Sequence, residues 1–315
     1  SGVYSVRETI RFTNENCDGR KVTVRGEDGA IISGGVAVPT ADFALADDKL
    51  SERFPESSRE NIVSVDLKKY GVDLEAVLSL DPEYRMITLN GETIRPSRFP
   101  DYGYLNIKSN FDSSTSSEPI YVEIPKTGIR QIEKWENLDG VRLFIYARQL
   151  YFAHRRPLLG YDADKKTISF RAIDSEGITD RSRFYFFNIP EEMTIAGEYY
   201  LSDDGILYIY KTDDFDGGEV RIATINDDII NIDGVDNLTF DNITLQDGNG
   251  TCLSGTANYL TVKNSTIRNA NNAIITTSGH DIKIHANTFY NLLSHGVDLK
   301  NDMLGLDPMN NEITY

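Results

Sequence analysis

The sequence is poor in the features that mark several common protein classes. Its only cysteines, Cys17 and Cys252, are far apart and lack the spacing of a disulfide framework or a metal site. No apolar run approaches the roughly 18 residues of a membrane-spanning helix. Positive charge is scarce as well, because 32 lysines and arginines face 49 aspartates and glutamates, for a net charge of -17. The long-range field therefore disfavours nucleic acid as a partner.

The chain has no leader segment at its N-terminus. It starts at Ser1-Gly2 without a methionine, as a processed or trimmed chain does, so the missing leader does not decide whether the protein is exported. The last residues, 311–315, read as the start of another strand. We therefore expect the natural protein to continue beyond Tyr315.

Three consecutive 22-residue segments near the C-terminus repeat one another. They are residues 236–257, 258–279 and 280–301, and Leu238, Leu260 and Ile282 fall in register. A fixed period in the low twenties, with short alternating strands broken by Asn and Gly, predicts a stacked coil of β-strands. Asn242 and Asn264 share one turn position, where stacked amides can bond successive backbones, whereas the third segment has Ala286 there.

The period divides the chain into three expected parts. Residues 1–35 read as first rungs, residues 36–217 lose the period, and residues 218–315 regain it. The simplest interpretation is a β-rich domain of residues 36–217 inserted between an early rung and the main coil. Within it we expect short helices over 57–67 and 74–80, and a hairpin over 198–210 that turns at Asp204-Gly205.

The combined pattern resembles the right-handed parallel β-helix repeat proteins of bacteria, many of which are secreted and act on polysaccharides. The segments that carry the resemblance are residues 2–10, 22–35, 89–100 and 187–210. The layout is similar to glycoside hydrolase family 141, which includes fucosidase and xylanase activities. The resemblance implies an all-β, right-handed parallel β-helix of about 22 residues per rung, located outside the cell or on its surface.

The end of the third segment also resembles these β-helix proteins in a short motif. Relatives often have a Gly-Gly-Asp-Arg turn followed by an Asn-Asn pair; here Asp302 fits the aspartate, and Asn310-Asn311 fit the pair. Met303 replaces the arginine, and residues 300–301 replace the glycines. These departures put a shared catalytic role for Asp302 in doubt.

Glycoside hydrolysis requires two carboxyl groups flanking the bond, about 5 to 10 Å apart. Strands of neighbouring rungs are about 4.8 Å apart, so outward carboxylates on adjacent or next-adjacent rungs satisfy that distance. Asp298 is expected in the column of Ser254 and Thr276, facing outward. The alternative for each candidate is an ordinary turn or surface aspartate. The candidates are Asp247, Asp298, Asp302 and Asp307.

Histidines and aromatic residues supply further candidates. His295 lies three positions before Asp298, close enough to share a cleft and act as an acid or orient a hydroxyl. Ordinary turn histidines and packed core aromatics are the competing interpretations. The predicted substrate-binding residues are Trp135, Tyr104, His285 and Arg268.

Metal chemistry is not a leading expectation. Residues 203–205 and 213–218 resemble fragments of a calcium loop, but neither has the full ligand sequence, and both are explained as turns. We predict no cofactor, with calcium as the alternative. The leading function is a glycoside hydrolase acting on an oligo- or polysaccharide. The alternatives are a polysaccharide lyase on a uronate-containing glycan and a non-catalytic glycan-binding protein.

Overall fold

The computed structural model describes residues 2–27, 29–110, 119–148, 150–171, 173, 177–300 and 310–314. The chain forms two compact units. Unit 1 comprises Ser1–Asp42, Leu67–Ile94 and Phe215–Tyr315, and unit 2 comprises Phe43–Asp66 and Arg95–Asp214. The expected domain limits at residues 35 and 218 lie near two of these boundaries, and residues 67–94 fall in unit 1.

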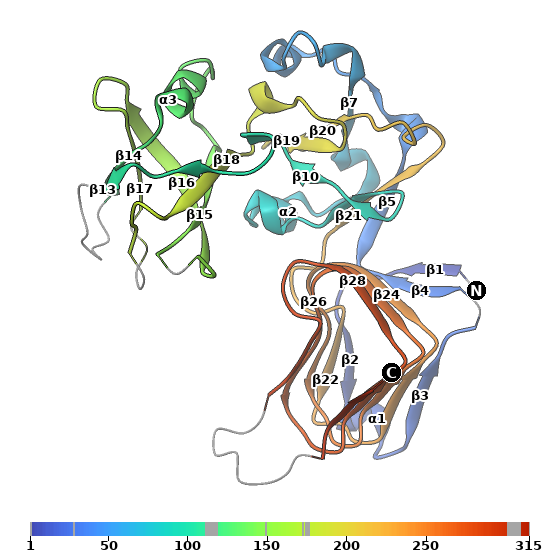
Figure 1. Ribbon diagram of the computed structural model, residues 1–315. Helices are drawn as coiled ribbons and strands as arrows, with labels where there is room; N and C mark the ends of the chain where they lie inside the picture. The colour runs from blue at the N-terminus through green and yellow to red at the C-terminus, as the bar shows by residue number, and fades with distance from the viewer. Residues whose placement is uncertain are drawn as a thin grey trace. The chain divides into compact units, whose positions relative to one another are not determined.

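Parallel strands make up most of unit 1 (Figure 1). One sheet contains β1 (Gly2–Ser5), β2 (Ile10–Thr13), β4 (Ala30–Ser33), β22 (Ile230–Asp233), β24 (Thr244–Thr256), β26 (Thr266–Ser278), β28 (Thr288–Leu292) and β29 (Val297–Leu299). A second contains β3 (Val22–Arg25), β23 (Leu238–Asp241), β25 (Thr261–Lys263), β27 (Lys283–His285) and β30 (Glu312–Thr314). Strands from both ends of the chain thus lie side by side.

The register of these strands follows the sequence repeat. Thr239 pairs with Thr261, which pairs with Lys283. Thr244 pairs in the same way with Thr266, and Thr266 with Thr288. The hydrogen bond from Arg268 to Gln246 likewise joins residues 22 apart in sequence. Equivalent residues of successive segments are therefore neighbours in space.

Three columns of left-handed residues bend the chain between strands. The columns are Asn237, Tyr259 and Asp281; Asn242, Asn264 and Ala286; and Asp247, Asn269 and Asn291, all with φ between 52° and 61°. Asn and Asp tolerate this conformation better than other non-glycine residues, and Asn264 Nδ2 also donates to Asp241 Oδ1 at 2.9 Å. The repeated Asn positions in the sequence therefore mark corners.

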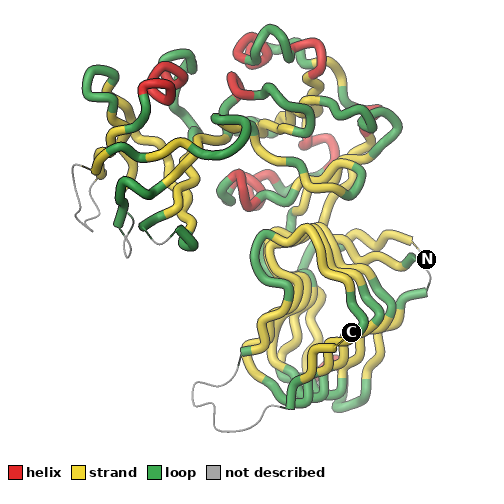
Figure 2. Tube along the Cα trace, in the orientation of Figure 1, coloured by secondary structure: helices red, strands yellow, loops and turns green. Residues whose placement is uncertain are grey.

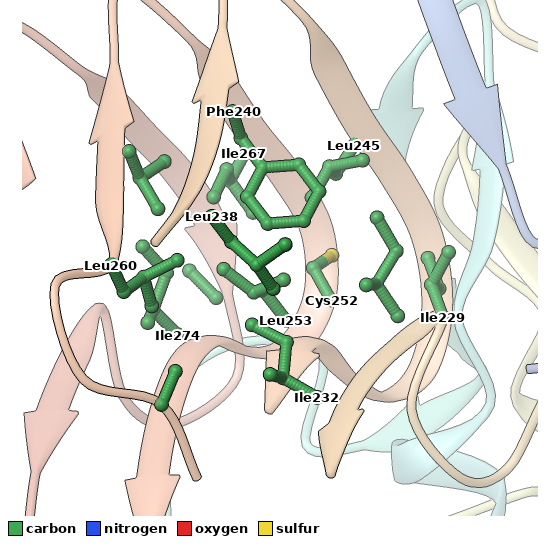
Figure 3. Packing of buried hydrophobic residues seen from close by; sticks show 14 of the residues in the cluster. Ile229, Ile232, Leu238, Phe240, Leu245, Cys252, Leu253, Leu260, Ile267 and Ile274 are labelled. Atoms are coloured by element: carbon green, nitrogen blue, oxygen red, sulfur yellow. The ribbon is translucent and has the colours of Figure 1, made fainter. Parts of the chain in front are cut away.

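The interior of unit 1 is apolar (Figure 3). Figure 3 shows the side chains of Leu238, Phe240 and Leu260 turned inward together with those of the neighbouring strands. Each of these three is about 1% exposed, as is Leu245. Cys252 lies in the same core at 0% exposure, and burial raises the pKa of its thiol. The alternation of apolar residues along the repeats thus places side chains such as Leu238 and Leu260 inside.

A smaller antiparallel sheet and two short helices complete unit 1. The sheet contains β5 (Gly35–Pro39), β21 (Glu219–Ala223), β8 (Ile87–Leu89) and β9 (Glu92–Thr93). The helices are α1 (Asn14–Cys17) and α2 (Leu74–Leu78). Thr13 caps α1 and Asp73 caps α2, each by accepting from a backbone N–H of the first turn.

Unit 2 contains two further sheets (Figure 2). One comprises β10 (Arg95–Pro96), β19 (Glu198–Leu201), β20 (Ile206–Tyr210), β7 (Ile62–Asp66) and β6 (Ala44–Leu45). The other comprises β11 (Arg98–Phe99), β12 (Leu105–Asn106), β18 (Arg183–Phe187), β15 (Arg142–Tyr146), β16 (Ala153–Asp162), β17 (Thr167–Arg171), β14 (Pro119–Glu123) and β13 (Ser109–Asn110). Helix α3 (Lys126–Ile132) buries Ile129 and Ile132.

Two local predictions in this region have different outcomes. The hairpin over 198–210 is confirmed, since β19 and β20 are antiparallel and Leu201 pairs with Leu207. The helix expected over 57–67 is wrong, because residues 62–66 form strand β7 between β20 and β6. Ile62 is 0% exposed and Val65 is 6% exposed, so burial on a strand outweighs the local helical pattern.

Candidate functional site

One outer face of unit 1 collects polar side chains from five strands. Its central column runs Arg11, Asn231, Ser254, Ile275 and Asp298, paired in that order on β2, β22, β24, β26 and β29. Ile232 and Leu253 alternate with this column and are 2% and 1% exposed in the core. Because side chains alternate along a strand, the column faces outward. We call this surface the Asp298 face.

A hydrogen-bonded carboxylate lies at the start of the Asp298 face. Asp228 accepts from the Ser254 hydroxyl and, at 3.0 Å, from Asn231 Nδ2. The Thr9 hydroxyl donates to the Asp228 backbone oxygen at 2.7 Å, and Arg11 Nη1 approaches Asn231 Oδ1 at 3.5 Å. These contacts hold Asp228 between Thr9, near the N-terminus, and Ser254 on β24.

A cavity of about 380 Å³ lies beside the residues that precede Asp228 in sequence. It is lined by Arg7, Glu8, Thr9, Arg11, Ala76 and residues 224–227. Asn226 is held at its wall, since its Nδ2 donates to the Ala76 backbone oxygen at 2.7 Å. The lining is mostly polar and charged, which suits a hydroxyl-rich ligand rather than an apolar one.

Asp298 lies on the same face, at the other end of the column. It is half-buried on β29, and its Oδ2 is 3.8 Å from Lys300 Nζ. Asp298 was expected to lie in one column with Ser254 and Thr276. The structure keeps Ser254 in that column but places Ile275 there instead of Thr276. The structure pairs Asp298 with Ile275, because the register of β24 and β26 shifts and Thr276 is 3% exposed.

His295 extends the Asp298 face beside Asn272. Its Nδ1 lies 3.2 Å from Asn272 Oδ1, and its backbone N–H donates to the same oxygen at 3.2 Å. The ring is also 2.8 Å from the Ser294 hydroxyl and is exposed. The shared cleft of His295 and Asp298 stays a prediction. Asp302 and Asp307 lie outside the described residues.

The strand spacing sets the distance between the two carboxylates. Asp228 bonds Asn231 on β22 and Ser254 on β24, and Asp298 lies on β29, beyond β26. Two to three steps of about 4.8 Å separate the two carboxyl groups, roughly 10 to 14 Å. That separation leaves room for a water molecule beside a sugar, and it is larger than the roughly 5 Å of a pair that forms a covalent intermediate. Asp228 was absent from the sequence-based candidates because it precedes the repeat.

Asp247 occupies a different position, at a buried corner of β24. It is 1% exposed with φ of 61°. Its Oδ2 accepts from the Ser33 hydroxyl and from Gln246 Nε2, both at 2.7 Å. Asn269 Nδ2, the equivalent corner in the next segment, lies 3.4 Å from its Oδ1. The carboxylate is thus enclosed by donors from β4, from its own strand and from the next corner, which suits a structural role.

Arg268 lies one residue before the next corner and bridges neighbouring strands. Its Nε donates to Gln246 Oε1 at 2.9 Å, and its Nη1 bonds the Tyr290 hydroxyl. His285 is on β27 of the second sheet, paired with Lys263 and Thr314. Arg268 and Asp247 are therefore linked through Gln246, whereas His285 and Asp298 lie in different sheets of unit 1.

The two aromatic candidates belong to unit 2. The prediction of Trp135 as a sugar platform does not fit the structure, because the ring is 6% exposed and packs edge-on against Phe186, 5.3 Å between centroids. A buried ring has no face to offer a substrate. Tyr104 is 38% exposed and lies 5.6 Å from the ring of Tyr146.

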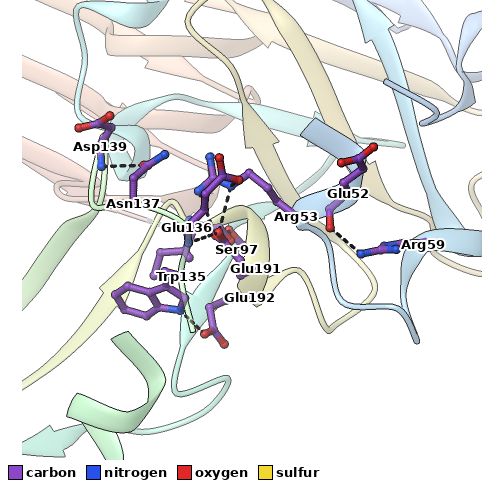
Figure 4. Close-up of polar contacts among 11 residues, drawn as sticks. Glu52, Arg53, Arg59, Ser97, Trp135, Glu136, Asn137, Asp139, Glu191 and Glu192 are labelled. Atoms are coloured by element: carbon purple, nitrogen blue, oxygen red, sulfur yellow. Dashed lines mark hydrogen bonds and ion pairs between the residues drawn. The ribbon is translucent and has the colours of Figure 1, made fainter. Parts of the chain in front are cut away.

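Two buried glutamates of unit 2 were also absent from the sequence-based candidates. Glu192 is 2% exposed, and its Oε1 accepts from Trp135 Nε1 and Gln131 Nε2 at 2.6 Å each (Figure 4). Burial raises the pKa of Glu192 to about 7, against the opposing effect of these donors. Glu198 is 0% exposed beside Arg95, and burial likewise raises its pKa to about 7. Their burial results from the packing of unit 2, which no local sequence motif predicts.

In the part of the chain that the structure describes, no group of three or more His, Cys, Asp or Glu side chains has the arrangement to hold a metal ion. Calcium binding remains a prediction for the full chain. Among the described helices, none has the length and apolar character to cross a membrane.

Comparison with known proteins agrees with the parallel-strand architecture. Residues 204–315 match the right handed beta helix region family. A solved structure named "Glycoside hydrolase" is similar over 93% of this chain, with a TM-score of 0.59 and 13% sequence identity. This chain spans 65% of that structure's length, and the likeness at this identity concerns the fold alone. No curated protein has a matching sequence. The protein is thus β-rich and contains a domain that matches the right handed beta helix region family.

Proposed function

We propose that the protein is a β-helix glycoside hydrolase that cleaves a plant or host polysaccharide at the Asp298 face. The proposed architecture is a coil of about 22 residues per rung, interrupted by an inserted β-rich domain, in a protein located outside the cell or on its surface. The observation that carries the proposal is a pair of carboxylates on one outer face: Asp228, which bonds Ser254 on β24, and Asp298 on β29.

The surroundings of the two carboxylates suggest different roles. Asp228 accepts hydrogen bonds from Ser254 and Asn231, which hold its carboxylate in one orientation. We assign it to activate a water molecule. Asp298 then protonates the leaving oxygen, and His295 orients a sugar hydroxyl. Because the separation exceeds the roughly 5 Å of a retaining pair, the proposed outcome is inversion at the anomeric carbon. The proposed reaction uses no metal or cofactor.

The decisive measurement compares three aspartate variants of the full-length protein. Plant and host glycans and nitrophenyl sugars are the substrates, and released reducing ends are the readout. We expect Asp228→Asn and Asp298→Asn each to lower kcat/KM by about 10² to 10⁴, the usual contribution of a positioned acid or base. Asp233→Asn is the matched control, because Asp233 is exposed on β22 one column away. Full activity of both test variants would refute the site.

The products decide between the proposal and its two alternatives. Reducing ends without unsaturated sugars support a hydrolase. Unsaturated uronates would instead identify a lyase. Binding without turnover would identify a glycan-binding scaffold.

A further inference from the structure

Two short stretches of unit 2 carry the chain between its two sheets. Ser97 leads from β10 in the five-stranded sheet to β11 in the eight-stranded sheet, and residues 188–198 lead back from β18 to β19. We call residues 188–198 the linking segment. The Ser97 hydroxyl donates to the Ile189 backbone oxygen at 2.6 Å and accepts from the Ile189 N–H at 2.9 Å, so the two stretches are bonded to each other. A movement of one sheet against the other must therefore bend the linking segment.

Glu191 of the linking segment contacts residues from both sides of unit 2. Its carboxylate accepts from Arg53 Nε at 3.0 Å and from Arg53 Nη2 at 3.1 Å, and Arg53 lies between β6 and β7 of the five-stranded sheet. The same carboxylate accepts from the Glu136 backbone N–H at 2.8 Å, between α3 and β15. This bidentate ion pair requires that the Glu191 carboxylate be ionised.

Glu192, the next residue, is held in a different way (Figure 4). Its Oε1 accepts from Trp135 Nε1 and from Gln131 Nε2, both at 2.6 Å, and both of these donors are neutral. Glu192 is 2% exposed and Trp135 is 6% exposed. The Trp135 ring packs edge-on against Phe186 of β18. The contact between Glu192 and Trp135 therefore fixes the linking segment to the core of the eight-stranded sheet.

The surroundings of Glu192 favour its neutral form. A carboxylate that is removed from water is costly unless a cation neutralises it. Burial is the largest cause that raises the pKa of Glu192, to about 7, and the negative charge of Asp101 adds to the rise. Lys134 opposes it, and its Nζ donates to Gln131 Oε1 at 3.0 Å. At the end of the linking segment, Glu198 accepts from Arg95 at 3.1 Å.

We propose that the linking segment is a pH-sensitive hinge of unit 2, closed while the Glu192 carboxyl is protonated and opening locally when that carboxyl ionises. Opening separates Glu192 from Trp135 and lets the charged carboxylate reach water. The two sheets then remain joined through Ser97 and through the ion pair of Glu191 with Arg53. This inference concerns unit 2 alone and does not rest on the proposed hydrolase.

The direction of the pH effect follows from the two states of Glu192. In the closed state its pKa is about 7, and in the open state it returns toward the ordinary value of 4.5. The closed state is therefore favoured fully below about pH 4.5, and that advantage is lost as pH rises to 7. Between these values Glu192 raises the equilibrium constant for opening by about tenfold per pH unit, about 300-fold in all, with no further rise above pH 7.

Hydrogen–deuterium exchange of the whole protein between pH 5 and pH 9 tests the hinge. Each peptide's exchange rate is divided by its intrinsic rate at that pH, which gives a protection factor. We expect the protection factor of residues 190–198 to fall by about tenfold per pH unit up to pH 7 and then to level off. Strand β18 should keep a higher protection factor at every pH, because the hinge opens without unfolding the sheet.

Three variants assign the effect to Glu192. Glu192→Gln should lose the contribution of about tenfold per pH unit, while Glu198 retains its own share. Asp101→Asn should move the levelling point to lower pH, and Lys134→Gln should move it to higher pH, because these charges have opposite effects on Glu192. These two changes provide a test if Glu192→Gln unfolds. Glu133→Gln is the control, because Glu133 is exposed at the end of α3.

Three outcomes would overturn the inference. Equal protection of residues 190–198 and of β18 would show that the linking segment opens only when unit 2 unfolds. An unchanged pH profile in Glu192→Gln would exclude this carboxyl as the titrating group. Shifts of the levelling point in the same direction in Asp101→Asn and Lys134→Gln would rule out the electrostatic argument.

Discussion

Ser33 donates its hydroxyl hydrogen to Asp247 Oδ2 at 2.7 Å, although the two residues are 214 positions apart in sequence. Both side chains are buried, at 0% and 1% exposure. The bond joins β4, near the N-terminus, to the corner of β24 in the repeat region. It also helps explain why Asp247 is better suited to holding strands together than to catalysis.

Replacing Asp247 should therefore affect stability more than turnover. We expect Asp247→Ala to lower the free energy of unfolding of unit 1 by about 2 to 4 kcal/mol, because two buried donors lose their acceptor. Asp247→Asn keeps one acceptor and should lose less. Chemical denaturation monitored by far-ultraviolet circular dichroism measures the stability of both variants. Asp233→Ala is the surface control. An Asp247→Asn variant with native stability and no hydrolysis would contradict this assignment.

Ala286 occupies the same corner position as Asn242 and Asn264 in the two preceding segments. Its φ is 53°, a left-handed conformation that costs an ordinary residue about 1 to 2 kcal/mol. Asn tolerates the conformation better, so Ala286→Asn should raise the free energy of unfolding by about 0.5 to 1 kcal/mol. Ala41→Asn, at an exposed position outside the corners, is the control and should give no gain. Equal effects of the two changes would disprove the argument.

Gly255 lies where the chain of β24 passes close to β22. A Cβ atom there would be 2.0 Å from the Ile232 backbone oxygen, and its φ of 123° disfavours other residues. Gly255→Ala should therefore cost about 3 kcal/mol or more and distort the Asp298 face. Gly296, which precedes β29, has open space around its Cα, so Gly296→Ala should change stability little. Thermal unfolding of the two variants tests the contrast, and similar melting temperatures would contradict it.

Glu192 should make the stability of unit 2 depend on pH. Burial raises its folded-state pKa to about 7, above the ordinary value of 4.5, with Asp101 adding to the rise and Lys134 opposing it. The folded state then holds a proton that the unfolded state releases. The associated stability is complete below about pH 4.5 and is lost as pH rises through 7, by at most about 3 kcal/mol.

The measurement compares melting temperatures at pH 5 and pH 8. We expect the native protein to melt lower at pH 8, and Glu192→Gln to reduce that difference while Glu198 retains its own share. A glutamine keeps an acceptor for Trp135 and Gln131. Glu60→Gln, at an exposed position, should leave the difference unchanged. An undiminished pH dependence in Glu192→Gln would exclude this residue as its source.

The sequence-based candidates included His295 and Asp298 but not Asp228. His295 and Asp298 were grouped because they are three residues apart, and their joint role stays a prediction. Asp228 was missed, since its contact with Ser254 depends on pairing between β22 and β24. Trp135 was misplaced because a lone aromatic residue looks the same in a sequence whether it is buried or exposed.

By itself the sequence determined the parallel strands of residues 236–301, because a repeat of period 22 with alternating apolar residues can bury its core only by stacking segments in register. It also determined the corners, since Asn and Asp recur where left-handed backbone is needed. Tertiary structure alone decided which acids face solvent together and which, like Asp247, are enclosed. The reason is that burial and strand register depend on contacts between residues such as Ser33 and Asp247, which no local pattern contains.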